Sequence, residues 1–209
     1  MKKELSETEK ADLFWKWFCE NQNNYLQVNQ KEGQEREQLL NMFLEKLHRY
    51  HPHLFFEMGG RSDTESELII TAEGIKDYFP AVELLVSRAP RLKGWNIIAF
   101  KPPMGTEFRI EIGGHQFEPG KIIFIPLDNK EQPSAVGIQV CYPQYTEENK
   151  NIFIQGTYLI LDVILGEKST TLDIDYLDIT QTPPNLSDYP YRHLSGIREY
   201  IEEKKRMIN

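Results

Sequence analysis

The sequence feature that most constrains the fold is a run of strand, helix and strand that occurs twice and ends each time at two adjacent prolines. The first copy spans residues 54–103 and the second spans residues 108–184. Proline lacks a backbone N–H and cannot continue a sheet ladder, so each proline pair ends the last strand of its copy. Few residues are identical between the copies. The pattern suggests an internal pseudo-repeat of two β-β-α-β units within a single domain of residues 1–209.

Hydrophobic periodicity predicts the individual elements. Residues 108–112 (FRIEI) alternate apolar and charged side chains, as a half-buried strand does, whereas residues 74–89 repeat apolar side chains at helical spacing. The order of elements predicts an α+β fold, in which N- and C-terminal helices flank a mixed or mostly antiparallel sheet. Strands are expected at 54–58, 67–72, 95–100, 108–112, 121–127, 135–142 and 171–179, and helices from Ser6, over 34–50, over 74–89, from Thr146 to Gly166 and over 193–209.

Composition limits the partners and the location of the protein. The net charge of −8 comes from 32 acidic and 24 basic residues with no Lys/Arg block, which argues against nucleic acid as a partner. The most apolar run, residues 152–165, is too short to span a bilayer and contains Asp162, so no membrane association is expected. No apolar signal sequence follows the N-terminal lysines. With Cys19 and Cys141 as its cysteines, the chain suits a reducing, cytoplasmic setting.

Four aromatic rings within five positions form the most unusual cluster in the chain. They are Phe14, Trp15, Trp17 and Phe18, on a helix that begins near Ser6. Rings on more than one face of a helix could anchor a protein partner or a homodimer, because tryptophan and phenylalanine supply large contact areas. The favoured interpretation is that they dock the helix on its own sheet, since one side of an amphipathic helix must pack inward. The four are therefore candidate protein-binding residues.

Three histidines lie within six positions, at His48, His51 and His53, and Glu57 follows. Imidazole and carboxylate groups are ligands for zinc, so this stretch is a candidate metal site. The spacing argues against it, because Pro52 separates the helix that carries His48 from the strand that carries His53. The alternative is a helix C-terminus, where histidines hydrogen-bond the last free carbonyls and face the negative end of the helix dipole.

Two further sets of residues have a functional and a structural interpretation. Asp173 and Asp175 would share one face of the expected strand 171–179, which suits a divalent cation or, alternatively, the solvent face of a sheet. Trp95, Tyr142 and Tyr158 could line a small-ligand site. No G-x-S-x-G, P-loop or dinucleotide-binding motif occurs in the sequence. The sequence therefore assigns no catalytic residue and implies no cofactor.

Residues 55–103, about a quarter of the chain, carry a resemblance to known sequences. The resembling features are the strand F-F-E, the segments E-L-I-I-T-A-E-G and F-P-A-V-E-L-L-V, and A-P-x-x-x-G-W before an apolar strand and Pro-Pro. This stretch resembles segments of uncharacterised bacterial proteins. The resemblance implies a bacterial, intracellular domain, and it implies no activity and no site residue.

The functional expectation is a non-catalytic module that binds or regulates another protein. It follows from the aromatic helix and the acidic balance, because an acidic domain can mask a basic partner through complementary charge. One alternative is a metal-assisted hydrolase that uses His48, His51, His53 and Glu57, or the pair Asp173 and Asp175. The other alternative is a domain that binds a small ligand.

Overall fold

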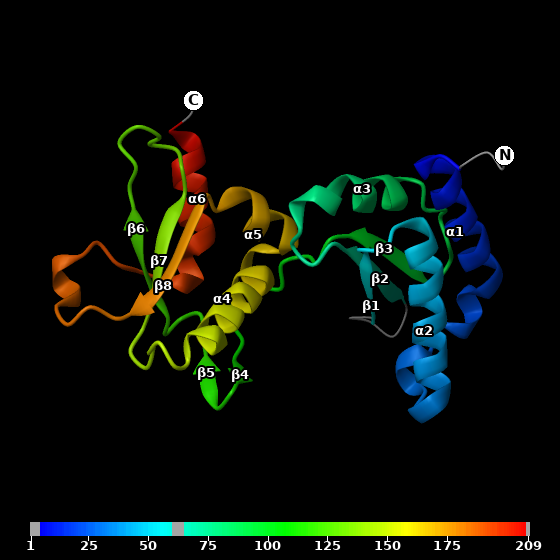
Figure 1. Ribbon diagram of the computed structural model, residues 1–209, viewed down its shortest axis with the longest axis horizontal. Coiled ribbons are helices and arrows are strands. Elements are labelled where there is room, and N and C mark those ends of the chain that lie inside the picture. The colour runs from blue at the N-terminus through cyan, green and yellow to red at the C-terminus, as the bar shows by residue number, and fades with distance from the viewer. Residues whose placement is uncertain (1–4, 60–64, 208–209) are drawn as a thin grey trace. The chain divides into compact units, whose positions relative to one another are not determined.

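We describe a computed structural model of the chain, which covers residues 5–59 and 65–207 (Figure 1). The fold is α+β, with helices at both ends of the chain and with mixed and antiparallel sheets, as the sequence predicts. Where the sequence suggested one domain, residue contacts divide the chain into two compact units, residues 1–101 (unit 1) and residues 102–209 (unit 2). Among the described residues, no helix has the length and apolar character needed to cross a membrane.

Unit 1 begins with helices and continues with one sheet. Its elements are the helices α1 (Glu7–Asn21) and α2 (Gly33–Tyr50), the strands β1 (Phe55–Gly59) and β2 (Ser66–Thr71), the helix α3 (Phe79–Ser87) and the strand β3 (Trp95–Ala99), with short 3₁₀ turns η1 (Gln22–Asn24), η2 (Val28–Gln30) and η3 (Lys76–Tyr78). Strand β2 pairs antiparallel with β1 and parallel with β3. The helix α3 is therefore the crossover between two parallel strands, and Figure 1 shows it with α1 and α2 around this sheet.

The helix boundaries in unit 1 follow from capping. The hydroxyl of Ser6 accepts from the backbone N–H of Glu9, and the Glu9 carboxylate accepts from the backbone N–H of Ser6, so α1 starts with a capping box. The helix α2 ends at Tyr50, two residues before Pro52: the N–H of His51 donates to the carbonyl of Leu47, and His51 itself is extended. The predicted starts of both helices and the predicted end of α2 are confirmed to within a residue.

Unit 2 contains a hairpin, a second sheet and its own helices. Its elements are the hairpin β4 (Ile110–Ile112) and β5 (His115–Phe117), the strands β6 (Ile123–Leu127) and β7 (Gly137–Tyr142), the helices α4 (Lys150–Leu165) and α5 (Glu167–Asp173), the strand β8 (Tyr176–Gln181), the turns η4 (Leu186–Asp188) and η5 (Leu194–Gly196), the strand β9 (Arg192–His193) and the helix α6 (Ile197–Arg206). The sheet has the strand order β8-β7-β6-β9, in which β7 and β8 are parallel and the other pairs antiparallel.

The two units repeat one arrangement of strands. In unit 1, Phe56 of β1 pairs with Ile70 of β2, which pairs with Ala99 of β3. In unit 2, Phe124 of β6 pairs with Val140 of β7, which pairs with Ile179 of β8. All six side chains lie on or against the hydrophobic core of their own unit. Strand order, strand direction, crossover helix and the position of a core phenylalanine therefore agree between residues 55–99 and 123–181.

One expected strand is wrong in its first half. Residues 167–173 form the helix α5, and β8 begins at Tyr176, so the alternation of TLDIDYLDI does not mark one continuous strand. The helix follows α4 directly because Gly166 adopts a φ of 80°, a backbone conformation that glycine tolerates and other residues avoid. The sequence also gave no indication of β5 or of the two-residue strand β9. These short strands exist through pairing with β4 and β6.

Candidate functional site

The aromatic cluster of α1 is part of the core of unit 1. The rings of Phe14, Trp15 and Phe18 are buried, and Phe18 contacts Trp95 of β3 at a centroid distance of 5.1 Å. The indole Nε1 of Trp15 donates to the carbonyl of Leu85 in α3, at 2.7 Å. These three rings dock α1 on its own sheet and crossover helix, which is the structural interpretation of the cluster.

Trp17 differs from its neighbours because it is only partly buried. Its ring contacts Tyr25 and Phe43 at 6.0 and 5.9 Å, and the ammonium of Lys46 lies 5.9 Å from its centroid. The indole therefore covers the edge of the core of unit 1 and is itself covered on one side by a cation. Of the four candidate protein-binding residues, Trp17 alone retains surface of intermediate exposure.

The three histidines at the end of α2 do not converge on one point. The imidazole Nε2 of His48 lies 3.1 Å from the carbonyl oxygen of Leu54, at the start of the sheet. His51 and His53 flank the ring of Tyr78, and the His53 ring stacks on it at 4.7 Å. Partial burial lowers the pKa of His51, with the nearby His53 and Lys10 acting in the same direction and Glu7 opposing them. The carbonyl that His48 contacts belongs to Leu54, beyond the end of α2, and not to the last turn of the helix.

Glu57, the fourth candidate ligand, points away from that arrangement. Its carboxylate forms an ion pair with Lys101 at 3.5 Å on the opposite face of the β1–β2 pair from the core. Over residues 5–59 and 65–207, no group of three or more histidine, cysteine, aspartate or glutamate side chains is arranged to hold a metal ion. Nothing in the described geometry therefore gathers His48, His51, His53 and Glu57 into a metal centre.

Asp173 and Asp175 are held separately. Asp173 ends α5, where its carboxylate accepts from the hydroxyl of Ser169 at 2.6 Å and pairs with Lys205 of α6 at 2.7 Å. The Asp175 carboxylate accepts from the backbone N–H of Val136 at 2.8 Å and so fixes the start of β7 beside β8. Each carboxylate has a local structural task, and the two do not share a strand face.

The three residues considered for a small-ligand site have different environments. Trp95 is buried in the core of unit 1, and Tyr142 is buried in the core of unit 2, where its hydroxyl bonds Thr157 at 2.7 Å. Burial raises the pKa of the Tyr142 phenol. Burial also raises the pKa of the Cys141 thiol to about 11, so this thiol is not a nucleophile at neutral pH. Tyr158, in contrast, is exposed on α4.

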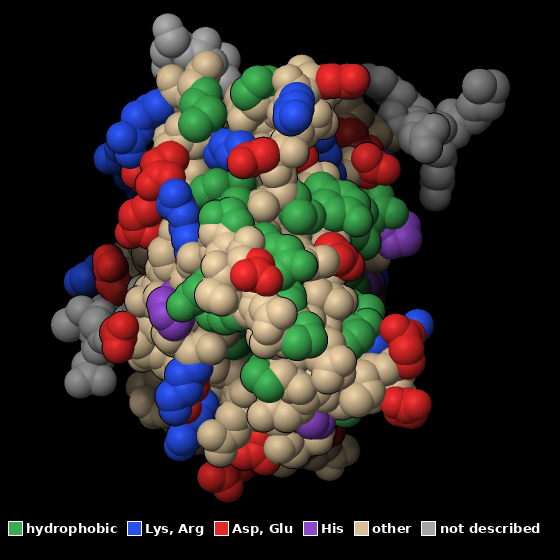
Figure 2. Space-filling view, turned by 90° about the vertical axis from the view of Figure 1, so that its left-hand side faces the viewer, with side chains coloured by type: hydrophobic (Ala, Val, Ile, Leu, Met, Phe, Trp, Pro, Cys, Tyr) green, Lys and Arg blue, Asp and Glu red, His purple; other side chains and the backbone are tan. Residues whose placement is uncertain are grey.

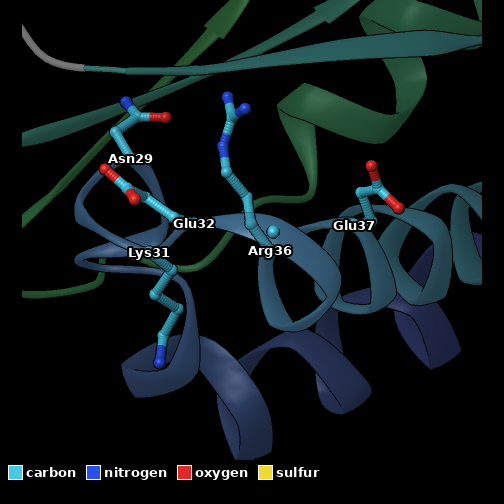
Figure 3. Close-up of a pocket in the computed structure, with 6 residues that line it drawn as sticks. Asn29, Lys31, Glu32, Arg36 and Glu37 are labelled. Atoms are coloured by element: carbon cyan, nitrogen blue, oxygen red, sulfur yellow. The ribbon is translucent and has the colours of Figure 1, made fainter.

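A polar hollow of about 440 Å³ lies at the start of α2 in unit 1 (Figure 3). It is lined by Asn29, Lys31, Glu32, Gly33, Arg36 and Glu37. Figure 3 shows that Lys31 and Arg36 point to different sides, so the two cations do not act on one point. The lysine pairs with Glu35, and the lining as a whole carries two positive and two negative charges. The hollow has no net preference for an anion or a cation, and we assign it no function.

The outer face of the unit 2 sheet offers a more distinctive surface. Ile123, Ile125 and Cys141 point away from the main core and form a small apolar cluster of their own, against which Leu186 packs. Leu186 belongs to residues 182–191, the segment that leads from β8 to β9 at the other edge of the sheet. Part of this segment therefore crosses the sheet and is held there by an apolar contact.

Three tyrosines are exposed around this outer face. The exposed fractions are 59% for Tyr176 at the start of β8, and 45% and 44% for Tyr189 and Tyr191 just before β9. The strands β8 and β9 are separated by two strands, which corresponds to about 14 Å. Figure 2, which views the molecule from this side, shows hydrophobic side chains gathered in the middle of the face with acidic side chains among them. We call Tyr176, Tyr189 and Tyr191 the tyrosine surface.

Acidic residues accompany each part of the tyrosine surface. Asp178 follows Tyr176 on the same face of β8, and its carboxylate accepts from the Gln139 amide and from the backbone N–H of Ile179. Asp188 precedes Tyr189 and is exposed. Unit 2 contains ten lysine and arginine residues against 16 acidic residues, a net charge of −6, whereas unit 1 has a net charge of −2. The surface therefore combines exposed rings with a negative field.

Comparisons with known proteins found no match for this chain. No protein-family model, no characterised protein and no solved structure matches this chain. The resemblance of residues 55–103 to segments of bacterial proteins stays a prediction. The tyrosine surface was not among the candidates from the sequence, although the local composition around S-D-Y-P-Y, residues 187–191, contains the signal: tyrosine, proline and aspartate together in a connecting segment.

Proposed function

We propose that this protein is a non-catalytic binding module, and that the tyrosine surface of unit 2 binds a basic, extended segment of a partner protein. The observation that carries the proposal is the exposure of Tyr176, Tyr189 and Tyr191 beside acidic side chains on one sheet. Tyrosine is enriched in protein interfaces because its rigid ring offers a large contact area at low entropic cost. Guanidinium and ammonium groups are attracted to aromatic faces, and the negative charge of unit 2 adds to that attraction.

The spacing of the tyrosines supports an extended ligand. Extended chain advances about 3.3 Å per residue, so the ~14 Å between β8 and β9 corresponds to four or five residues. We also propose a cytoplasmic location, because both cysteines are unpaired, as is usual where thiols are kept reduced.

The test is titration of the full chain with a short peptide of alternating arginine and glycine, followed by amide NMR shifts. We expect shifts in residues 176–191 and binding that weakens between about 0.1 M and about 1 M salt, because exposed charges are screened. The double variant Tyr189→Ser/Tyr191→Ser should bind at least about tenfold more weakly. The matched control is Phe55→Ser on β1 of unit 1, which removes a ring of comparable exposure (41%) outside both proposed surfaces and should bind as the wild type does. Shifts confined to other surfaces, or equal losses in both variants, would contradict the proposal.

A further inference from the structure

The exposed side of α4 is unlike that of the other long helices. No charged residue occurs between Lys150 and Asp162, and the exposed stripe carries Ile154, Tyr158 and Leu159, with exposed fractions of 38%, 51% and 44%. The exposed side of α2, in contrast, carries several charged residues, among them Glu35 and Glu45. Single exposed apolar residues need no explanation, but three that share one helix face form a contact surface.

The inner side of α4 is already occupied by its own unit. Phe153, Ile160 and Ile164 belong to the core of unit 2, and Gly156 lies so close to the ring of Phe117 that a Cβ atom there would be 2.3 Å from it. The helix therefore cannot rotate to bury its outer stripe without breaking this packing. Unit 2 itself therefore leaves the stripe uncovered, and burying it requires a surface outside unit 2.

The stripe has a similar order of polar and apolar side chains whether it is read from its N-terminal or its C-terminal end. Its members, at helical spacing, are Asn151, Ile154, Gln155, Tyr158, Leu159 and Asp162. Two copies related by a two-fold axis would pair antiparallel, and the axis would lie between positions 156 and 157. Ile154 would then face Leu159 of the second copy, Gln155 would face Tyr158, and Asn151 would face Asp162. Aliphatic groups meet aliphatic groups, and amides meet a phenol and a carboxylate.

We infer that α4 is the interface through which two copies of this chain associate as an antiparallel pair. Two-fold contacts of this self-complementary kind are the commonest in homo-oligomers. Antiparallel pairing also opposes the two helix dipoles, whereas parallel pairing would place the two Asp162 carboxylates side by side. This interface is separate from the tyrosine surface, and the inference does not rest on the proposed function.

The size of the stripe sets the expected strength of the pair. From position 151 to 162 the helix advances about 17 Å. A contact of that length buries less than the ~800 Å² per partner that is typical of tight complexes. We therefore expect association that depends on concentration, with a dissociation constant between about 10 μM and about 1 mM.

The test is sedimentation equilibrium of the full chain over that concentration range, with two charge variants. Ile154→Lys and Leu159→Glu should each weaken self-association at least about tenfold, because each places a charge against an aliphatic group. A mixture of the two variants should associate about as well as the wild type. In a mixed antiparallel pair, the new lysine faces the new glutamate, and the other contact keeps the native Ile154 and Leu159.

The control is Met42→Glu, which changes a comparably exposed apolar residue of α2 and should leave self-association unchanged. Circular dichroism of each variant checks that the helices remain folded. A wild-type chain that stays monomeric up to about 1 mM would overturn the inference. So would single variants that associate like the wild type, or a mixture that associates no better than either variant alone, because the antiparallel register requires the rescue.

Discussion

Units 1 and 2 contain the same β-β-α-β arrangement, but the chain completes it differently in each. In unit 1 the helices that precede the repeat cover the sheet, and side chains satisfy carbonyls along the edge strand β1: His48 at Leu54 and Asn29 at Met58. In unit 2 the segment that follows the repeat supplies a further strand: the edge strand β6, which is equivalent to β1, pairs with β9. Carbonyl groups at a sheet edge need partners, and side chains or a further strand can supply them.

The units also differ in how their exposed apolar side chains are distributed. In unit 1 the rings of α1 fill the core, and the carbonyl of Leu85 in the crossover helix accepts from Trp15 of α1. In unit 2 the helix α6 contacts α4 where the guanidinium of Arg198 donates to the carbonyl of Ile164 at 2.8 Å. The outer stripe of α4 and the tyrosine surface remain exposed on unit 2. Unit 1 also exposes large apolar side chains, such as Leu13, Met42 and Phe55, but these lie on three different elements, α1, α2 and β1.

The largest effect is expected from Phe18→Ala in unit 1. Phe18 is fully buried among aromatic rings, so the substitution should lower the stability of unit 1 by about 3–5 kcal/mol. Urea unfolding followed by tryptophan fluorescence measures this, because Trp15, Trp17 and Trp95 all lie in unit 1. The buried Cys141 thiol reports on unit 2, and it should stay protected from alkylation while unit 1 unfolds. Equal loss of both signals would show that the two units unfold as one.

The corresponding variant of unit 2 is Gly156→Ala, which should lower the stability of unit 2 by about 2 kcal/mol. The added methyl group overlaps the buried Phe117 ring, and this overpacking exceeds the gain of about 1 kcal/mol in helix propensity. Reactivity of Cys141 in urea, in a Cys19→Ser background, measures the change. The matched control is Gly196→Ala, where a Cβ atom meets only the Glu199 carboxylate at 3.8 Å and stability should barely change. Similar losses in both variants would argue against tight packing at Gly156.

A smaller effect is expected from Lys204→Met, which tests how α6 is attached to the sheet of unit 2. The buried ammonium of Lys204 bonds the Asp128 carboxylate at 2.7 Å and the carbonyl of Pro133 at 3.0 Å. Methionine keeps most of the apolar stem but loses both bonds, so we expect a loss of about 1–2 kcal/mol. Lys205→Met removes an ion pair on a more exposed side chain and should cost less. A larger loss of stability from Lys205→Met than from Lys204→Met would contradict the buried attachment.

The smallest effect concerns the pH dependence of unit 1. Burial lowers the pKa of His51 in the folded state below its ordinary value of 6.5, so the unfolded chain binds the proton more readily. The stability due to neutral His51 is fully present above pH 6.5 and is lost as the pH falls from there toward the lowered pKa. His51→Gln should flatten this part of the profile, measured by tryptophan fluorescence in urea. An unchanged slope would show that other groups dominate.

Much of the α+β order followed from local pattern. The proline pairs, the alternation of FRIEI and the helix start at Ser6 each depend on neighbours in the chain, and each is found where the sequence places it, to within a few residues. The strand predicted over 171–173 was wrong because alternation over a few residues also occurs in a short helix. Whether a helix or a strand forms there depends on Gly166 and on the packing of α5 against α4.

The candidate sites show more clearly which properties are local in the sequence and which depend on packing. The Pro52 break predicted the end of α2, because a break in backbone direction is a local property, but it did not predict the contacts that His48, His51 and His53 make with Leu54 and Tyr78. The burial of Phe14, Trp15 and Phe18 and the exposure of Tyr176, Tyr189 and Tyr191 are not local properties. An aromatic ring has the same sequence signature whether its neighbours cover it or not.

The sequence by itself determined the periods, the breaks and the twofold recurrence of one strand-helix-strand order, because backbone sterics and side-chain spacing act over a few residues. Tertiary structure alone decided which apolar side chains became core and which stayed at the surface. That outcome depends on long-range contacts such as β9 on β6 and α1 on α3, whose residues are separated by about seventy positions in the chain.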